Sequence, residues 1–207
     1  MTTSKETYHH GDLRQSLILT ATDILKEHGV DGISMRKLAD QVGVSRTAPY
    51  HHFKDKTALL CSIAEQGFIL QNEIIEAFYQ NERNLSLQSS FEQYVFAYIQ
   101  FAEDNSETYD LMYGRDIWKS DSVSESLKET SKKSFKLWIQ WIEILQKENV
   151  ISQIGSPLIV GQTTWATLHG ICRLFMDGIY LDRQDIKEMA QQAITLLTLT
   201  SNNTQPS

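Results

Sequence analysis

The sequence has few of the residues that build disulfide frameworks or many tight turns. Its 207 residues include two cysteines, three prolines and ten glycines. Cys61 and Cys172 lie far apart, each inside an apolar helical pattern and not in a C-x-x-C pair. We therefore expect two buried free thiols in a reducing compartment and not a disulfide scaffold. The scarcity of turn residues argues against a fold of many short strands.

A long hydrophobic run and an apolar leader are also missing. The first residues, MTTSKETYHHGDLR, are polar, so we expect no signal peptide. The best candidate for a membrane span, 157–172, has no charge but is short and is interrupted by polar residues such as Gln162 and His169. It falls short of the roughly 20 apolar residues that a spanning helix needs. These features predict a soluble, cytoplasmic protein.

The chain has no overall positive charge, because its net charge is −7. The charge is unevenly divided, however. Residues 1–60 contain eight Lys and Arg against seven Asp and Glu, whereas residues 61–207 contain eleven against nineteen. Any recognition of a polyanion must therefore depend on a local patch in the N-terminal segment and not on the total charge.

Apolar residues recur at helical spacing along most of the chain and predict an all-α protein. Gly29 and Gly43 are expected to end the first two helices, and Ser34, Ser45 and Asp55 to cap the helices that follow them. The ranges 106–113 and 156–178 are further helices, and GRDIWKSDS is expected to be a loop. The remaining expected helices are 12–28, 35–42, a short helix from Arg46, 56–81, 88–103, 123–148 and 183–200. A domain boundary near residue 70 would divide the chain into 10–70 and 71–201.

Pro49 occupies an unusual position in this pattern. If Ser45 is the N-cap, Pro49 is the fourth helical residue and the first whose N–H would bond back to a helix carbonyl. Proline has no N–H, so we expect the first turn of this helix to loosen.

Neither histidine doublet predicts a metal site. Adjacent helical residues point about 100° apart, so His51 and His52 are poorly placed to bind one ion. We expect His9 and His10 to lie on a solvated arm. The sequence also shows no nucleophile with its base and no metal shell, so we expect neither an enzyme nor a cofactor.

A helix, a short glycine turn and a second helix form the helix-turn-helix arrangement. A short helix that presents Arg46 and Thr47 can enter the major groove, where a guanidinium pairs with guanine and small groups meet thymine methyls. Tyr50, His51 and Lys56 offer hydrogen-bond donors for phosphates. Arg36 can reach the DNA backbone or a base from the preceding helix.

The segment GISMRKLADQVGVSRTAPYHHFKDKTALL, residues 32–60, resembles the N-terminal domain of the TetR family of transcriptional regulators. The resemblance implies a three-helix DNA-binding domain followed by a helical domain that binds an effector and dimerises. His52 has two readings, a phosphate contact or structural packing. The positions that the resemblance places near double-stranded operator DNA are Arg36, Ser45, Arg46, Thr47, Ala48, Tyr50, His51, His52 and Lys56.

The C-terminal part gives a weaker signal. WATLHG, residues 165–170, resembles the W-x-x-x-H-G motif of one TetR subgroup, as do Pro49 and the opening YHHGDLR. Trp165 and His169 share a helix face and could form either core packing or an effector contact. The aromatic stripe is open to the same two readings. The residues considered for an effector site are Tyr94, Tyr98, Phe101, Met112, Trp118, Trp138, Trp141, Trp165 and His169.

The resemblance also implies a homodimer formed through the last two helices. These helices are apolar over more than one face, which is typical of burial in a large core or against a partner. The favoured function is a transcriptional regulator, in this family most often a repressor released by a small-molecule effector. The alternative is an adaptor or small-molecule-binding protein that has kept the fold without binding DNA.

Overall fold

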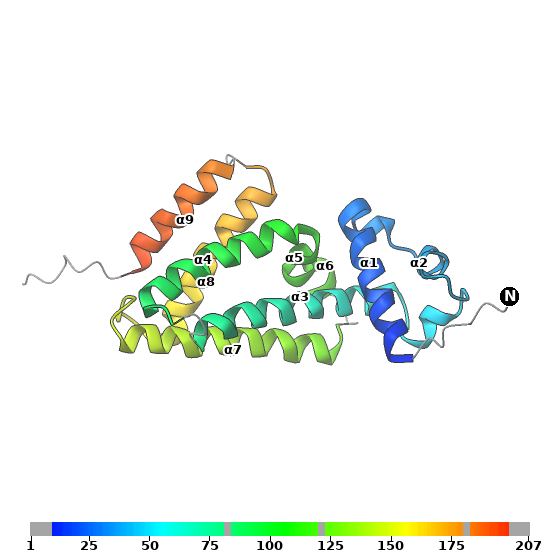
Figure 1. The fold of residues 1–207 in the computed structure, drawn as a ribbon, viewed down its shortest axis with the longest axis horizontal. Helices are drawn as coiled ribbons and strands as arrows, with labels where there is room; N and C mark the ends of the chain where they lie inside the picture. The colour runs from blue at the N-terminus through cyan, green and yellow to red at the C-terminus, as the bar shows by residue number, and fades with distance from the viewer. Residues whose placement is uncertain (1–9, 81–83, 120–122, 180–182, 199–207) are drawn as a thin grey trace, which may run out of the picture. The chain divides into compact units, whose positions relative to one another are not determined.

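A computed structural model describes residues 10–80, 84–119, 123–179 and 183–198 of the chain, and these residues are almost entirely helical (Figure 1). In the described residues the one β-type pairing is an isolated antiparallel bridge between Ile151 and Thr198. The predicted all-α fold, with an N-terminal helix-turn-helix region and a C-terminal helical region, is confirmed.

Most of the expected helices lie within a few residues of their predicted ends. The prediction of a loop over 114–122 is wrong in part, because Arg115–Trp118 forms a helical turn. The Trp118 indole Nε1–H donates to the Met112 carbonyl at 2.7 Å, which closes the chain into this turn. The elements are α1 His10–Gly32, α2 Met35–Val42, the 3₁₀ helix η1 Ala48–His51, α3 Lys56–Tyr79, α4 Leu87–Asp104, α5 Ser106–Tyr113, α6 Arg115–Trp118, α7 Glu125–Lys147, α8 Pro157–Met176 and α9 Arg183–Leu197.

The predicted helix ends depend on local chemistry, and most of them are correct. Gly29 interrupts α1 with a φ of 65°, although helical turns resume as far as Gly32. Gly43 ends α2 in the left-handed conformation that glycine adopts without steric cost. The Asp55 carboxylate accepts the Ala58 N–H at 2.9 Å and caps α3. Ser34 stands at the N-cap position of α2, but its side chain makes no cap hydrogen bond.

Packing divides the chain into two compact units, and the division falls inside α3 between Gly67 and Phe68. The first unit contains the chain up to Gly67 together with Glu107–Glu129, and the second contains Phe68–Ser106 and the chain from Thr130 onward. The predicted domain limits, 10–70 and 71–201, stay predictions, and the residues from 199 on lie outside the described ranges.

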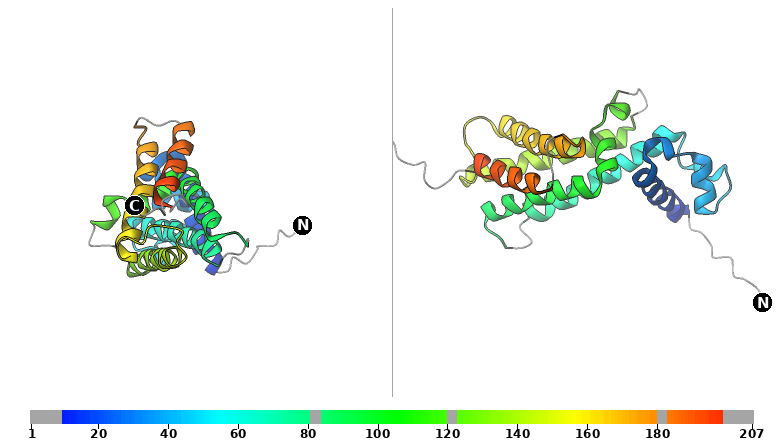
Figure 2. Two further views of the ribbon diagram at one scale, coloured as in Figure 1. Left: turned by 90° about the vertical axis from the view of Figure 1, so that its left-hand side faces the viewer. Right: turned by 90° about the horizontal axis from the view of Figure 1, so that it is seen from above.

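Each unit has its own apolar core. In the first, Leu17, Leu38 and Leu59 bring buried side chains from α1, α2 and α3. In the second, α4, α8 and α9 contact one another, and Figure 2 shows α8 and α9 side by side. The second half of α3 lies beside α7, where Lys133 Nζ is 3.4 Å from Glu76 Oε1.

Candidate nucleic-acid interface and effector cavity

The turn between α2 and η1 is held by backbone hydrogen bonds. The N–H groups of Gly43 and Val44 both donate to the Ala39 carbonyl, the second at 3.0 Å. The Ala48 N–H then donates to the Ser45 carbonyl at 2.9 Å. Together these bonds fix the direction in which the chain leaves α2, and so they fix which residues of the turn face solvent.

The prediction of an α-helix that begins at Arg46 is wrong. Ala48–His51 forms a 3₁₀ helix, and Ser45 does not cap it, because its hydroxyl is instead 3.1 Å from the Thr47 hydroxyl. Without an N–H, Pro49 cannot donate to the Ser45 carbonyl as an α-helix requires. The bonds that define the 3₁₀ helix are of the i to i−3 type: Tyr50 N–H donates to the Thr47 carbonyl at 3.1 Å, and His52 N–H to the Pro49 carbonyl at 3.0 Å. The same Pro49 carbonyl also accepts an i to i−4 bond from the Phe53 N–H at 2.9 Å.

Pro49 is therefore a second-position residue of a short 3₁₀ helix, where its missing N–H leaves no bond unmade. The ring is buried. The expected loosened first turn is replaced by a turn of a different type.

Phe53 anchors this turn to the unit's core. Its ring is buried, and the Arg14 guanidinium carbon lies 5.4 Å from the ring centroid. The same guanidinium donates from Nη2 to the Ser62 hydroxyl at 3.1 Å. Residues from α1 and α3 thus hold the segment after η1 in place, which supports the exposed side chains next to it.

The predicted DNA-contacting residues divide into an exposed group and a half-buried group. Arg46 carries an exposed cation: its Nε is 3.9 Å from Asp40 Oδ1, and the two side chains are 62% and 58% exposed. Such an exposed pair contributes at most about 1 kcal/mol, so a phosphate or base could replace Asp40 at little cost. The exposed group is Arg36, Ser45, Arg46, Thr47, Tyr50 and His51, and the half-buried group is Ala48, His52 and Lys56.

The start of α3 is a second candidate position for a phosphate contact. Lys56 is the first residue of this 24-residue helix, and the helix N-terminus carries unpaired N–H groups and a positive dipole end. Asp55 pairs with the N–H of Ala58. A cationic side chain beside free backbone donors suits a phosphate.

The aromatic residues predicted for an effector site do not form one pocket. Tyr94 stacks on Trp138 with ring centroids 5.3 Å apart and meets Trp141 edge-on at 5.0 Å. All three are buried. Met112 and Trp118 belong to the other packing unit and contact each other there. Most of this stripe is therefore core packing, and its role in binding an effector stays a prediction.

Trp165 and His169 do meet, as their spacing predicts. Their rings stack with centroids 5.2 Å apart and planes 25° apart, and the Trp165 Nε1–H donates to the Tyr98 hydroxyl at 3.2 Å. Burial, with a smaller contribution from the positive charge of Arg173, lowers the pKa of His169 below 6.5. His169 is therefore mainly neutral at pH 7, and the two readings of this pair both stay open.

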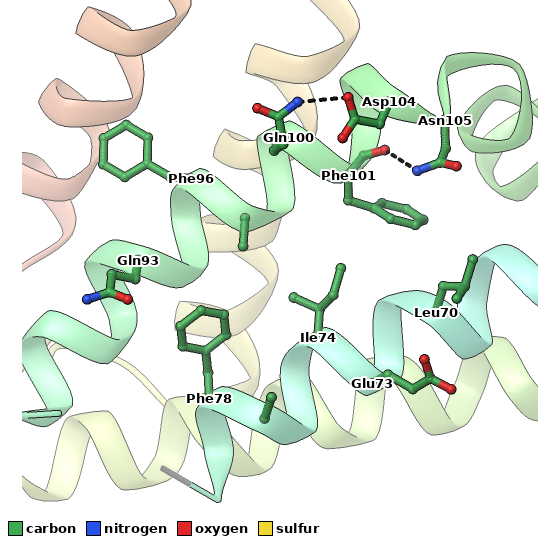
Figure 3. A pocket seen from close by; sticks show the side chains of 12 residues that line it. Leu70, Glu73, Ile74, Phe78, Gln93, Phe96, Gln100, Phe101, Asp104 and Asn105 are labelled. Atoms are coloured by element: carbon green, nitrogen blue, oxygen red, sulfur yellow. Dashed lines mark hydrogen bonds between the residues drawn. The ribbon is translucent and has the colours of Figure 1, made fainter. Parts of the chain in front are cut away.

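A cavity of about 740 Å³ lies between α3 and α4 within the second unit (Figure 3). We call it the α3–α4 cavity. Of the residues predicted for an effector site, Phe101 lines it and the others named for it do not. Sequence reasoning missed its remaining walls, although both helices place lining residues at helical spacing. Its lining residues are Leu70, Glu73, Ile74, Ala77, Phe78, Gln93, Phe96, Ala97, Gln100, Phe101, Asp104 and Asn105.

Two further findings concern metal ions and membranes. No three His, Cys, Asp or Glu side chains gather there as a metal-binding group. None of the helices seen in the described ranges is long and apolar enough to cross a membrane. The opening YHHG lies outside the described side chains.

Comparison with known proteins assigns the chain to a family. Residues 17–63 match the family of bacterial regulatory proteins called tetR. Residues 91–197, more than half of the chain, match the tetracyclin repressor-like C-terminal domain. The chain belongs to the TetR family. The predicted DNA contacts, Arg36 to Lys56, fall inside the first TetR match.

Similar proteins fall into two groups. The tetracycline repressor protein class A from transposon 1721 of Escherichia coli is 50% identical over 50 residues, which cover 24% of this chain and 23% of that protein. The HTH-type transcriptional repressor AcnR of Corynebacterium diphtheriae is 36% identical over 62 residues, covering 30% and 33%. The matches thus span a quarter to a third of these curated relatives.

Solved structures of similar fold cover far more of the chain. A protein of unknown function from Rhodococcus sp. RHA1 has a TM-score of 0.78 and 30% identity and covers 94% of this chain and 100% of that one. A TetR-family transcriptional regulator from Pectobacterium atrosepticum has a TM-score of 0.63 and 20% identity, covering 89% and 90%. The second likeness shows the shared fold.

Proposed function

We propose that this TetR-family chain is a DNA-binding transcriptional regulator that acts as a homodimer. The observation that carries the proposal is the exposed surface formed by α2 and η1, where Arg36, Arg46 and Tyr50 face solvent over a turn fixed by buried Pro49 and Phe53. This surface lies inside the match to tetR-family regulatory proteins. The named relatives that match the same region are described as repressors.

Each residue of the surface has a chemical role in the proposal. Arg46 and Thr47 read base edges in the major groove, where an arginine pairs with guanine O6 and N7. Tyr50 and Lys56 bind phosphates, Lys56 with the help of the α3 N-terminus. Arg36 reaches the DNA from α2.

The remaining members of the surface have supporting roles. His51 is exposed and donates to a phosphate, whereas Ser45 and Ala48 allow close approach of the backbone. Half-buried His52 lies beside Phe53, with ring centroids 6.4 Å apart. This position fits structural packing as well as a phosphate contact.

Regulation would follow from the second unit. A small molecule that binds the DNA-free conformation more tightly than the DNA-bound one lowers DNA affinity by the difference between its two binding free energies. Dimerisation through α8 and α9 would present two reading surfaces to a two-fold operator. In this proposal the chain is a repressor that its effector releases, and it is not an enzyme.

Arg46→Ala tests the DNA-reading role. We expect a loss of about 1 to 3 kcal/mol in binding to a specific site, the size of one bidentate base contact. A gel shift against the DNA upstream of the protein's own gene measures it, with nonspecific DNA as competitor. Lys26→Ala, which removes an exposed cation from α1, is the charge-matched control. Equal losses of DNA affinity in both variants would contradict base reading by Arg46. If the unaltered protein does not retard the DNA, the alternative function of an adaptor that does not bind DNA is favoured.

A further inference from the structure

Two exposed carboxylates are among the residues that line the α3–α4 cavity. Glu73 of α3 and Asp104 of α4 line it, and no lysine, arginine or histidine is among its described lining residues. Neither carboxylate forms an ion pair within the described part of the chain. The Gln100 Nε2–H donates to Asp104 Oδ1 at 2.8 Å, which orients that carboxylate but leaves its charge in place.

The two carboxylates lie toward the same end of the cavity. α3 and α4 run antiparallel, because Phe78 near the end of α3 contacts Tyr94 near the start of α4, with ring centroids 5.9 Å apart. Glu73 lies in the middle of α3 and Asp104 is the last residue of α4. Figure 3 shows both toward the end that also holds Leu70 and Phe101.

The rest of the cavity is mainly apolar and aromatic. Ile74 and Phe78 come from α3, and Phe96 and Phe101 come from α4. Phe96 is 39% exposed, so an aromatic face is available to a bound molecule. Cations are attracted to the faces of aromatic rings. A volume of about 740 Å³ lies within the roughly 300 to 1,000 Å³ typical of small-molecule sites.

We propose that the α3–α4 cavity binds a lipophilic organic cation. Its positive group lies near Glu73 and Asp104, and its hydrocarbon part contacts Phe78, Phe96 and Phe101. Both carboxylates are exposed, so an anion of the same size would be repelled by them and a neutral molecule would gain nothing from their charge. The regulatory consequence, release of DNA on cation binding, rests on the proposed function, whereas the binding itself does not.

Two ions of matched size and opposite charge provide the test. Titration calorimetry of the full chain in sodium buffer would measure the affinities of the protein for tetraphenylphosphonium and for tetraphenylborate. We expect the phosphonium to bind at least tenfold more tightly. Glu73→Gln and Asp104→Asn should each weaken phosphonium binding roughly threefold to fivefold, the effect of one exposed ionic contact. Neither substitution should weaken the binding of tetraphenylborate.

Glu143→Gln is the matched control, because it removes one carboxylate from the same unit, where it pairs with Lys147 at 3.1 Å and does not line the cavity. We expect Glu143→Gln to change the affinity for the phosphonium less than twofold. Equal affinities for the two ions, or an equal loss in Glu143→Gln, would overturn the proposal. If a substitution prevents folding, which a thermal unfolding curve reveals, the comparison of the two ions on the unaltered protein still decides.

Gel shifts with and without the phosphonium separate this proposal from the regulatory one. Selective phosphonium binding by a protein that retards no DNA would support the cavity assignment and contradict the regulatory function. DNA retardation by a protein that does not distinguish the two ions would contradict the cavity assignment alone.

Discussion

The four tryptophans differ in what their indole nitrogens contact. Trp138 Nε1–H donates to the Gly161 carbonyl at 2.8 Å, and Trp165 and Trp118 also donate to oxygen atoms. Trp141 is fully buried, and its Nε1 has no hydrogen-bond partner among the described residues. A buried donor without a partner loses its bonds to water without replacement. Trp138 and Trp141 therefore contribute unequally to stability.

Trp138→Phe and Trp141→Phe make this difference measurable. Both remove similar volume from the same aromatic cluster, but Trp138→Phe also removes a hydrogen bond worth about 1 kcal/mol. We expect Trp138→Phe to lower the free energy of unfolding by about 1 to 2 kcal/mol more than Trp141→Phe does. Urea denaturation of both variants measures it. Equal destabilisation would show that the Trp138 bond contributes nothing net.

His169 gives a pH dependence whose sign follows from its environment. Burial, then the charge of Arg173, lowers its pKa in the folded chain below 6.5. The unfolded chain therefore binds more protons in this range, and stability falls as the pH falls. The contribution is complete above about pH 6.5 and is lost as the pH decreases from there through the lowered pKa.

His169→Gln removes this contribution. We expect the free energy of unfolding to decrease less between pH 7.5 and pH 5.5 in His169→Gln than in the unaltered protein, since the other titrating groups are shared. Urea denaturation at the two pH values measures the difference. Parallel pH profiles would mean that His169 titrates alike in the folded and unfolded chains.

At the scale of single elements, two helix starts that look alike in sequence differ in structure. Asp55 accepts the Ala58 N–H and caps α3, whereas Ser34 at the start of α2 makes no such bond. We expect Asp55→Ala to cost about 1 kcal/mol of stability and Ser34→Ala to cost much less. Thermal or urea unfolding of the two variants compares them, and a larger loss in Ser34→Ala would contradict the assignment.

The short helix that follows the proposed base-reading residues Arg46 and Thr47 has a proline as its second residue. We expected an α-helix with a loosened first turn, but residues Ala48–His51 form a 3₁₀ helix with i to i−3 hydrogen bonds. The sequence pattern could not distinguish the two, because four residues are too few to show a period. The presence of the turn and its exposed residues could be predicted, but its helical type could not.

At the scale of the whole molecule, the proposed dimer accounts for apolar side chains left in solvent. Leu174 of α8 is 40% exposed and Leu196 of α9 is 75% exposed. Exposed apolar side chains on both helices of the proposed interface would be covered in such a dimer.

Leu174→Glu combined with Leu196→Glu should therefore convert a dimer into single chains, because two buried charges without partners oppose association. Sedimentation equilibrium measures the mass. Leu19→Glu, at an exposed apolar position of α1, should leave the mass unchanged. A mass unaffected by the double substitution would place the dimer interface elsewhere or exclude a dimer.

The sequence by itself determined the features that depend on neighbouring residues. Gly43 requires a left-handed conformation, Asp55 accepts an N–H three residues ahead, and Pro157 starts α8, so these helix ends follow from local chemistry. The pattern of residues 32–60 also predicted the TetR family.

The tertiary structure alone decided which side chains face a core and which face a cavity. Tyr94 and Trp141, for which the sequence left core packing and an effector contact open, are buried. Glu73, Phe96 and Asp104, which the sequence did not single out, line the α3–α4 cavity. A helical period shows which residues share a face of a helix. Whether that face lines a core or a cavity depends on how α3 and α4 pack together, and their packing is set by contacts between residues far apart in the chain.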